Sequence, residues 1–460
     1  MAKYKAYPEY KDSGVEWLGE IPKKWTPTQV KYGFNVTLGK MLQKTKQSFS
    51  DELKPYLKAQ NIQPNGINLD VVDKMWFSTN EKQKLKLKIN DVLVSEGGDV
   101  GRTAIWKGEL EECYVQNALN RVRPLLKNTS SFFYYWMIFL KSSEYINIIC
   151  NKATIAHYTA EKLECTPIFL PDERQQLIIS TFLNDETVKI EALIGKQHQL
   201  IELLKEKRQA VISHAVTKGL NPDVPMKVSG VEWFGDVPLH WSKTIIKHIA
   251  KINPLKTKIT PDLMKKECSF IPMENLKLNK IILDEHRVVK DVYNSYTYFE
   301  DKDILMAKVT PCFENKNIAI AKNLFNGLGF GTTEIYVIRC NNQVKNEFLF
   351  YRLQEDNFSA IAEGSMTGAG GLKRVPQEVV NSFKFHLPSI CEQKEIVSFL
   401  NSVTAKIDTL IQKQLQQIDL LKERRTALIS AAVTGKIDLR DWMPPASSTE
   451  ASLTTEEATA

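Results

Sequence analysis

Two groups of polar side chains in this chain have the chemistry needed to read the edges of DNA bases. Arginine and lysine match the acceptors of guanine, asparagine matches adenine, and threonine can touch the methyl group of thymine. The first group comprises Arg102, Thr103, Asn117, Asn120 and Arg121. The second comprises Lys308, Thr310, Asn315, Lys316, Thr332, Thr333, Lys373 and Arg374. Each could equally be a solvated loop residue, so DNA binding by these side chains is a hypothesis.

Motifs of catalysis and of metal or cofactor binding are missing from the sequence. There is no G-x-x-x-x-G-K-[ST] phosphate loop, and the glycines at 327–331 precede an expected strand rather than the helix of a dinucleotide site. The histidines form no H-x-x-x-H pair and no Cys/His pair with zinc spacing. The methyltransferase tetrapeptide Asn/Asp-Pro-Pro-aromatic is absent too, since Asn253-Pro254-Leu255 lacks its second proline. We expect a non-catalytic chain without its own metal or cofactor.

An internal duplication organises the segments that must position the polar groups. Ser13–Trp17, Gly19, Pro22 and Trp25 recur at the same spacing as Ser229–Trp233, Gly235, Pro238 and Trp241. A second block recurs likewise: Pro171, Gln176 and Phe182–Asn184 match Pro388, Gln393 and Phe399–Asn401. The interiors, 35–165 and 251–385, differ in most residues. We expect each proline to set a turn that lays the following tryptophan on a domain surface.

The second repeated block has the spacing of a coiled-coil helix. The positions of this seam follow one another at intervals of four and three in both copies. Its apolar members include Ile190, Ile194, Ile201 and Leu204 in the first copy, and Ile407, Ile411, Ile418 and Leu421 in the second. Gln197/Gln414 and Arg208/Arg425 are polar seam positions, which tend to fix register and partner choice. Gly219 and Gly435 are expected C-terminal caps. Two matched seams favour pairing of the two helices with each other over packing on separate domains.

These patterns predict a mixed α/β (α+β) fold with two globular domains, joined by a pair of long antiparallel coiled-coil helices and related by a pseudo-two-fold repeat. Short apolar runs such as Asp91–Val94 and Asp303–Met306 indicate strands, and 132–141 and 347–353 indicate helices. The expected boundaries are 1–171 and 221–388 for the domains, 172–220 and 389–442 for the helices, and 443–460 for a disordered tail.

Composition is that of a soluble globular protein with a basic surface. The 460 residues carry a formal net charge of +7, and the last stretch, Pro444–Ala460, is acidic, so the rest is more basic still. A basic excess favours a polyanionic partner. No apolar run is long enough to cross a membrane, and the 7 cysteines show no C-x-x-C pair. We expect a cytoplasmic protein.

The repeated frames resemble the specificity subunits of Type I restriction–modification enzymes. Tyr10–Trp25 resembles the N-terminal signature of that family, and Leu203–Gly219 and Leu420–Gly435 resemble its helical spacers. Thr310–Asn315, Gly329–Glu334 and Gly370–Pro376 are similar to one recurring class of target-recognition domain. The family pattern has Gly-Lys after the asparagine at 315, where this chain has Lys316-Asn317.

The resemblance implies a division of labour among subunits. Each target-recognition domain would read one half of a bipartite, asymmetric site on double-stranded DNA, and the helices would set the spacer and dock two methyltransferase (M) subunits. Those subunits would bind S-adenosylmethionine and methylate adenine N6 after base flipping. Two restriction/translocase (R) subunits would bring ATP and Mg²⁺ for an endonuclease. The complex would be nucleoid-associated in a bacterial or archaeal cytoplasm.

Two other functions remain open at this point. The chain could be a self-contained DNA methyltransferase or nuclease, although its motifs are missing. It could also be a scaffold or adaptor whose paired helices bind protein and whose domains do not read DNA. From Thr187 to Lys218 a helix would measure about 48 Å, which spans about 14 base pairs of B-DNA. This length favours two DNA readers about one helical turn apart.

Overall fold

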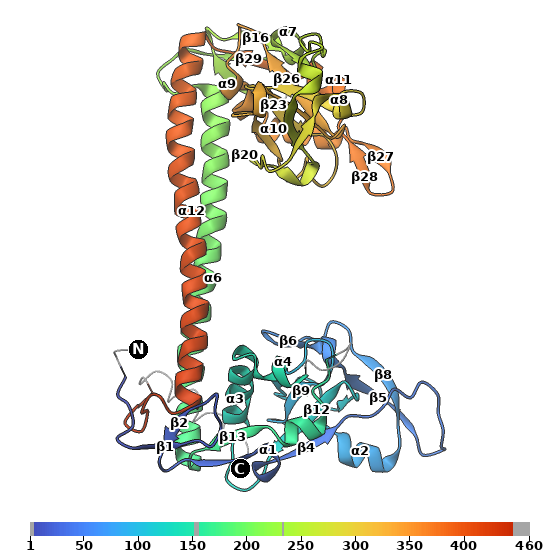
Figure 1. The fold of residues 1–460 in the computed structure, drawn as a ribbon, viewed down its shortest axis with the longest axis vertical. Helices are drawn as coiled ribbons and strands as arrows, with labels where there is room; N and C mark the ends of the chain where they lie inside the picture. The colour runs from blue at the N-terminus through green and yellow to red at the C-terminus, as the bar shows by residue number, and fades with distance from the viewer. Residues whose placement is uncertain (1–3, 151–155, 232–233, 445–460) are drawn as a thin grey trace. The chain divides into compact units, whose positions relative to one another are not determined.

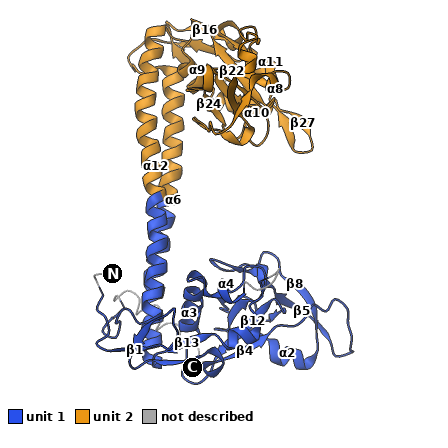
Figure 2. Cartoon of the chain, viewed as in Figure 1, with its two compact units in different colours: residues 1–197, 416–460 blue, residues 198–415 orange. Residues whose placement is uncertain are grey.

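A computed structural model describes residues 4–150, 156–231 and 234–444. The chain forms two compact units (Figure 2): unit 1 comprises residues 1–197 and 416–460, and unit 2 comprises residues 198–415. Each unit contains one α/β domain and part of each of two long helices, α6 (Glu173–Lys218) and α12 (Ile390–Val433). Most of the predicted tail, 443–460, lies outside the described residues, as does Trp233.

Unit 1 is built on two sheets (Figure 1). A four-stranded antiparallel sheet has the order β10-β9-β12-β4, with bounds Thr103–Ile105, Val92–Ser95, Leu119–Pro124 and Phe34–Leu38. A second sheet, β11-β5-β8, comprises Tyr114–Val115, Glu52–Leu57 and Asp73–Phe77. Short strand pairs are β1–β2 (Tyr10–Asp12, Glu20–Pro22), β3–β13 (Thr26–Gln29, Pro167–Leu170) and β6–β7 (Ile62–Gln63, Gly66–Ile67). The helices are α1 (Val30–Gly33), α2 (Thr79–Leu85), α3 (Ser130–Ser142), α4 (Tyr145–Cys150) and α5 (Ala160–Glu164).

Unit 2 has two four-stranded sheets. The first has the strand order β17-β26-β23-β24, with bounds Ala250–Ile252, Ile335–Cys340, Ile304–Ala307 and Ile318–Ile320. The second has the order β21-β18-β25-β22, with bounds His286–Val288, Glu267–Ile271, Leu328–Gly331 and Thr297–Glu300. Strand pairs are β14–β15 (Met226–Val228, Asp236–Pro238), β16–β29 (Ser242–Ile245, Lys384–Leu387), β19–β20 (Leu276–Lys277, Lys280–Ile281) and β27–β28 (Thr367–Ala369, Leu372–Arg374). The helices are α7 (Ile246–Ile249), α8 (Val289–Val292), α9 (Asn346–Arg352), α10 (Asp356–Gly364) and α11 (Gln377–Ser382).

The predicted helix seam is present, and it extends over helices of 46 and 44 residues. Most seam residues are buried, and Leu204 and Ile411 are half-buried. In unit 2 the guanidinium of Arg208 donates to Asp408 at 3.1 Å, and in unit 1 Arg425 pairs with Glu191. The α12 residue with the higher number, Arg425, thus pairs with the α6 residue with the lower number, Glu191, so the helices run antiparallel. The predicted fold, mixed α/β domains with a pair of long antiparallel helices, is confirmed.

The repeated frame residues fasten each domain to the long helices. Gln176 and Gln393 play the same part: the side-chain carbonyl accepts from a backbone N–H of the domain at 2.9 and 2.8 Å, and the amide donates to the proline carbonyl before the helix at 3.0 and 2.9 Å. Phenol groups of α3 and α9 donate to Asn184 and Asn401 in the same way. These residues recur in the sequence because each copy joins a domain to a long helix through the same hydrogen bonds.

The expectation that the second tryptophan of each frame lies on a surface is wrong. Trp25 and Trp241 are each 1% exposed. Each indole N–H donates to a side chain in the first turn of a long helix, Trp25 to Gln175 at 3.3 Å and Trp241 to Glu392 at 3.0 Å. An indole buried with its N–H satisfied contributes a large apolar area at little polar cost. The turn thus drives the ring into the joint between domain and helix.

Both glycine caps have the positive φ that a helix C-terminus favours, 76° at Gly219 and 71° at Gly435. Gly435 has a second reason to be glycine, because a Cβ there would lie 2.3 Å from Cγ of Pro22. The C-terminal end of α12 thereby packs against the N-terminal frame of unit 1. A backbone bond from Asp438 N–H to the carbonyl of Lys5, 2.7 Å, continues the contact.

Candidate nucleic-acid interface

An exposed hairpin, β27–β28, is the centre of the predicted group in unit 2. All six strand residues are exposed. Thr310 fixes the hairpin to the loop after β23: its hydroxyl donates to the carbonyl of Gly371 at 2.8 Å and accepts from the N–H of Lys373 at 3.0 Å. Gly370 and Gly371, with φ of 64° and 82°, form the tight turn that two left-handed residues allow. The hairpin thus presents Lys373 and Arg374 on a supported strand.

Arg374 forms an ion pair with Glu334. Its guanidinium donates to both oxygens of Glu334, at 2.8 and 3.0 Å, and this pairing lowers the pKa of the Glu334 carboxyl. Thr332 accepts from the N–H of Glu334 at 3.3 Å. Lys308 lies beside them. Its backbone N–H donates to the carbonyl of Glu334, and its ammonium lies 5.2 Å from the centroid of the Tyr336 ring.

The structure therefore gathers three separated segments into one surface, the hairpin cluster: Lys308, Thr310, Thr332, Thr333, Glu334, Lys373 and Arg374. The sequence prediction did not include Glu334. A carboxylate accepts from the amino group of cytosine, and an arginine donates to guanine. The cluster therefore offers complementary groups for both bases of one pair.

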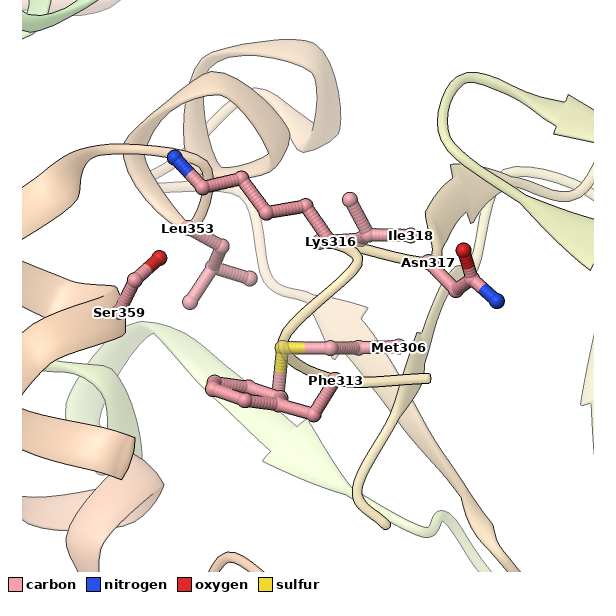
Figure 3. A pocket seen from close by; sticks show the side chains of 7 residues that line it. All are labelled: Met306, Phe313, Lys316, Asn317, Ile318, Leu353 and Ser359. Atoms are coloured by element: carbon pink, nitrogen blue, oxygen red, sulfur yellow. The ribbon is translucent and has the colours of Figure 1, made fainter. Parts of the chain in front are cut away.

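Lys316 takes part in packing rather than in the hairpin cluster. Its ammonium bonds to Asp356 at 2.8 Å and to the carbonyl of Gln354 at 3.2 Å. Figure 3 shows its side chain extended over a cavity whose volume is about 10 Å³, enough for about one water molecule. Asn315 is exposed on the turn before it.

Three residues of the predicted group in unit 1 form hydrogen bonds within their own domain. Arg102 donates to Asp99 at 2.8 Å and to the carbonyl of Ile62 at 2.9 Å. Thr103 donates to the carbonyl of Gly101 at 3.0 Å. Asn117 is half-buried, and its backbone N–H donates to the backbone carbonyl of Lys40 at 2.9 Å. The side chains of Arg102 and Thr103 are therefore engaged in hydrogen bonds, whereas the hydrogen bond of Asn117 leaves its side chain unused.

Asn120 and Arg121 are buried, so direct contact of their side chains with DNA does not fit the structure. They lie on β12, which pairs with β9 on one side and β4 on the other. Asn120 donates to the carbonyl of Tyr158 at 3.3 Å. Arg121, 3% exposed, donates to the hydroxyl of Thr37 at 3.1 Å, and burial lowers the pKa of its guanidinium.

A lysine-rich loop in unit 1 carries exposed ammonium groups, unlike the buried Asn120 and Arg121. The sequence prediction did not include this loop. Residues 39–50 follow β4 and border a surface hollow of about 540 Å³ that Lys40, Lys44, Gln43, Thr45, Gln47 and Lys84 line. The ammonium of Lys46 lies 5.4 Å from the ring of Trp76. We refer to the exposed residues Lys44, Lys46 and Lys84 as the lysine loop cluster. Lys40 is not part of it, because its side chain is 10% exposed and its ammonium pairs with Glu81.

Asp51 holds this loop in shape. Its carboxylate accepts from the N–H of Gln47 at 3.0 Å, from the N–H of Ser48 at 3.1 Å and from the amide of Gln43 at 3.0 Å. These hydrogen bonds, the one from Gln47 foremost, lower the pKa of Asp51. The density of lysine, glutamine and serine between two strands is the sequence signal that could have identified the loop.

Within residues 4–150, 156–231 and 234–444, no group of three or more His, Cys, Asp or Glu side chains is arranged to hold a metal ion. Within the same ranges, no helix is both long and apolar enough to cross a membrane.

Solved structures share this architecture. A chain from a study of complex assembly and conformational transition of the type I R-M system aligns with a TM-score of 0.62 at 14% identity, over 91% of this chain and 99% of that one. The HsdS subunit from Thermoanaerobacter tengcongensis aligns with a TM-score of 0.51 at 12% identity, over 91% and 98%. At these identities the likeness shows the fold.

The sequence of the chain also resembles those of two curated proteins. The chain is 36% identical over 187 residues to the Type I restriction enzyme EcoAI specificity subunit of Escherichia coli, a match to 40% of this chain and 31% of that protein. It is 22% identical over 432 residues to the StySPI specificity subunit of Salmonella potsdam, over 91% and 90%. The match to EcoAI spans about a third of that relative's length.

A family model describes both halves of the chain. The Type I restriction modification DNA specificity domain matches twice, at residues 22–203 and 241–420, which together make up most of the sequence. The two matches coincide with the two repeats, each with its domain and the helix after it. The relatives are named as specificity subunits rather than as methyltransferases or endonucleases. The chain belongs to the Type I restriction modification DNA specificity family, as the sequence motifs had suggested.

Proposed function

We propose that this chain is the sequence-reading subunit of a Type I restriction–modification complex and is not itself catalytic. Each domain reads one half of a bipartite DNA site, and the paired helices set the spacer between the halves. They also dock two methyltransferase subunits, and two restriction/translocase subunits complete the complex. S-adenosylmethionine, ATP and Mg²⁺ are held by those partners.

One observation carries this proposal: two specificity-domain matches share a frame but present different surfaces. The frame residues make the same bonds in both units, whereas unit 2 presents the hairpin cluster and unit 1 the lysine loop cluster. Since phosphate contacts position a protein and base contacts specify the sequence, two different surfaces on one frame favour two different half-sites. We assign base reading in unit 2 to Arg374 and Glu334.

A DNA-binding measurement separates this function from its alternatives. The chain with its methyltransferase partner is expected to bind duplex DNA with an affinity that falls steeply with salt and depends on sequence. Absent or salt-insensitive binding would indicate a scaffold instead. Methylation of DNA by the purified chain alone would indicate a self-contained enzyme.

Replacing Lys44 and Lys46 together by alanine is expected to make the slope of log affinity against log salt shallower by about 2, because each phosphate contact contributes about 0.9. The loss should be nearly the same for all DNA sequences. Binding titrations at several salt concentrations measure the slope. The matched control is the double variant Lys107→Ala and Lys127→Ala, which removes two exposed lysines of unit 1 outside the loop. Equal slopes for wild type and the loop variant would refute phosphate contact.

Inserting one heptad into each of α6 and α12 is expected to lengthen the recognised spacer by about three base pairs. Seven residues add about 10.5 Å to a helix, while B-DNA rises about 3.4 Å per base pair, and whole heptads keep the apolar seam in register. Selection of bound sequences from a random pool measures the spacer. A heptad in α6 alone serves as the control that breaks register. An unchanged spacer in the double insertion would rule out the helices as the ruler.

A further inference from the structure

The sheet of unit 1 that contains β9 and β12 has the same strand order and register as the sheet of unit 2 that contains β23 and β26. Ser95 faces Leu119 in the first sheet as Ala307 faces Ile335 in the second. The neighbouring strand pairs, β10–β9 and β24–β23, correspond in the same way. Because the two sheets correspond strand for strand, the residues of the hairpin cluster that adjoin these strands have identifiable counterparts in unit 1.

Glu96 is the unit 1 counterpart of Lys308 in the hairpin cluster. The backbone N–H of Lys308 donates to the carbonyl of Glu334 at 3.0 Å, and the backbone N–H of Glu96 donates to the carbonyl of Ala118 at 2.9 Å. An acidic side chain therefore lies in unit 1 where unit 2 has a basic one. The acidic partner of Arg374 is replaced at the same time by the methyl group of an alanine.

His157 is the counterpart of Arg374 by the same criterion. The backbone N–H of Tyr158 donates to the carbonyl of Glu96 at 2.8 Å, as that of Val375 donates to the carbonyl of the corresponding lysine at 2.9 Å. His157 directly precedes Tyr158 as Arg374 directly precedes Val375, and His157 is exposed. The same place on the two sheets thus carries a carboxylate with an imidazole in unit 1, and an ammonium with a guanidinium in unit 2.

The fold does not satisfy the carboxylate of Glu96. Its Oε2 atom is buried and has no hydrogen-bond partner among the described residues. Burial raises the pKa of the Glu96 carboxyl, while His157 and Asn120 act in the opposite direction. Asp91, before the other end of β9, differs because its carboxylate is paired with Arg123. A buried acceptor without a partner costs stability, and such departures from good packing are characteristic of functional sites.

The pattern of groups in the major groove of DNA decides which base suits this carboxylate. Guanine and thymine present acceptors there, and adenine presents an acceptor beside its amino group, whereas cytosine presents its amino group alone. A carboxylate is an acceptor, so cytosine is the base it favours. Glu96 is half-buried, and rotation about the last bond of a glutamate side chain is broad, so either oxygen can turn toward the accessible side.

We propose that Glu96 is the base-reading residue of unit 1 and that it accepts a hydrogen bond from the amino group of a cytosine. This rests on the proposed function and names a base for the half-site that Arg374 does not read. The lysine loop cluster holds the DNA backbone in this unit, and Glu96 supplies the sequence preference. The two units thus use one place on a shared sheet, with opposite charge, to select different bases.

The variant Glu96→Gln tests the assignment, because it keeps the size of the side chain but adds an amide donor that suits the other bases. In complex with its methyltransferase partner, it is expected to lose about tenfold in discrimination for cytosine at one position. That position should lie in the half-site that Arg374→Ala leaves unchanged. Affinities for duplexes with one base pair changed measure the effect. Glu111→Gln, at an exposed glutamate of unit 1 away from β9, is the matched control and should keep the wild-type profile.

The thermal stability of the variants separates base reading from a role in the fold. Removing a buried charge that lacks a partner should leave the Tm of Glu96→Gln equal to that of the wild type or higher. A lower Tm with equal weakening at every base pair would show that Glu96 supports the fold, and would overturn the assignment.

A DNA duplex in which the read cytosine is replaced by a pyrimidinone that lacks the amino group tests the same contact from the other side. The wild-type complex should lose about tenfold in affinity, whereas Glu96→Ala should show a much smaller loss, since its contact is already absent. Equal losses in both proteins, or unchanged discrimination in Glu96→Gln, would overturn the assignment while leaving the proposed function intact. Binding by the wild-type complex that is independent of sequence would overturn the proposed function itself.

Discussion

Replacing Arg374 by alanine is expected to weaken recognition of one half of the DNA site by about 1–3 kcal/mol, and to leave recognition of the other half unchanged. Arg374 is exposed on the hairpin, and its guanidinium is already oriented by the two hydrogen bonds to Glu334. A planar donor pair held in this way suits the two acceptors of guanine. Affinities for a panel of DNA duplexes, each with one base pair changed, measure the effect at every position.

Arg374→Lys separates base reading from phosphate binding. Lysine keeps the charge but loses the two-pronged geometry, so base discrimination should fall while the salt dependence stays near the wild-type value. Glu334→Gln should also alter discrimination, because it removes the negative charge and turns one of the two acceptor oxygens into an amide donor, which weakens the pairing with Arg374. Equal weakening at both halves of the site would show that Arg374 is a general phosphate contact, and would contradict the assignment.

Replacing Arg352 by alanine is expected to destabilise unit 2 by about 3–5 kcal/mol, the cost of breaking a buried ion pair by removing one partner. Arg352 is 2% exposed, its guanidinium lies 4.5 Å from the ring centroid of Phe234, and it lies 3.5 Å from the carboxylate of Glu355. Burial lowers the pKa of Arg352 to about 10 and raises the pKa of Glu355. Without the guanidinium, the carboxylate remains buried without its counterion.

Urea denaturation with native-state hydrogen exchange of β29 measures this loss, and the strands of unit 1 serve as an internal reference. Lys258→Ala is the matched control: it removes the cation of an exposed pair with Glu300, where the side chain of Lys258 is 68% exposed, and should cost at most about 1 kcal/mol. The double variant Arg352→Met, Glu355→Leu should recover much of the stability, since apolar pairs replace buried ion pairs well. A small loss in Arg352→Ala would contradict the buried-pair account.

The parts that sequence predicts well are those fixed by period and repetition. The three-and-four spacing of Ile190 and Ile407 identifies the paired helices because burial on a helix follows its turn. The repeated Gln176 and Gln393 identify a joint before its geometry is known, since the same bonds need the same side chains. The strands expected at 91–94 and 303–306 are present as β9 and β23, and the helices expected at 132–141 and 347–353 are present as α3 and α9.

The site was harder to predict because burial depends on neighbours that are distant in sequence. Asn120 and Arg121 follow a loop, yet they lie on a central strand flanked by β9 and β4, so pairing from both sides buries them. Lys316 is near Thr310 in sequence, but α10 supplies Asp356 and draws its ammonium away. The Glu334–Arg374 pair joins residues that only the hairpin brings together.

We propose that this chain selects DNA sites for methylation by its partners. Mapping of methylated adenines across the genome with and without this gene tests that role most directly. We expect a two-part motif, with a fixed gap, to be methylated in the parent strain and to lose methylation on deletion. Arg374→Ala expressed in the deletion strain should relax only one part of the motif. An unchanged pattern of adenine methylation after deletion, in cells that express the methyltransferase, would contradict the account.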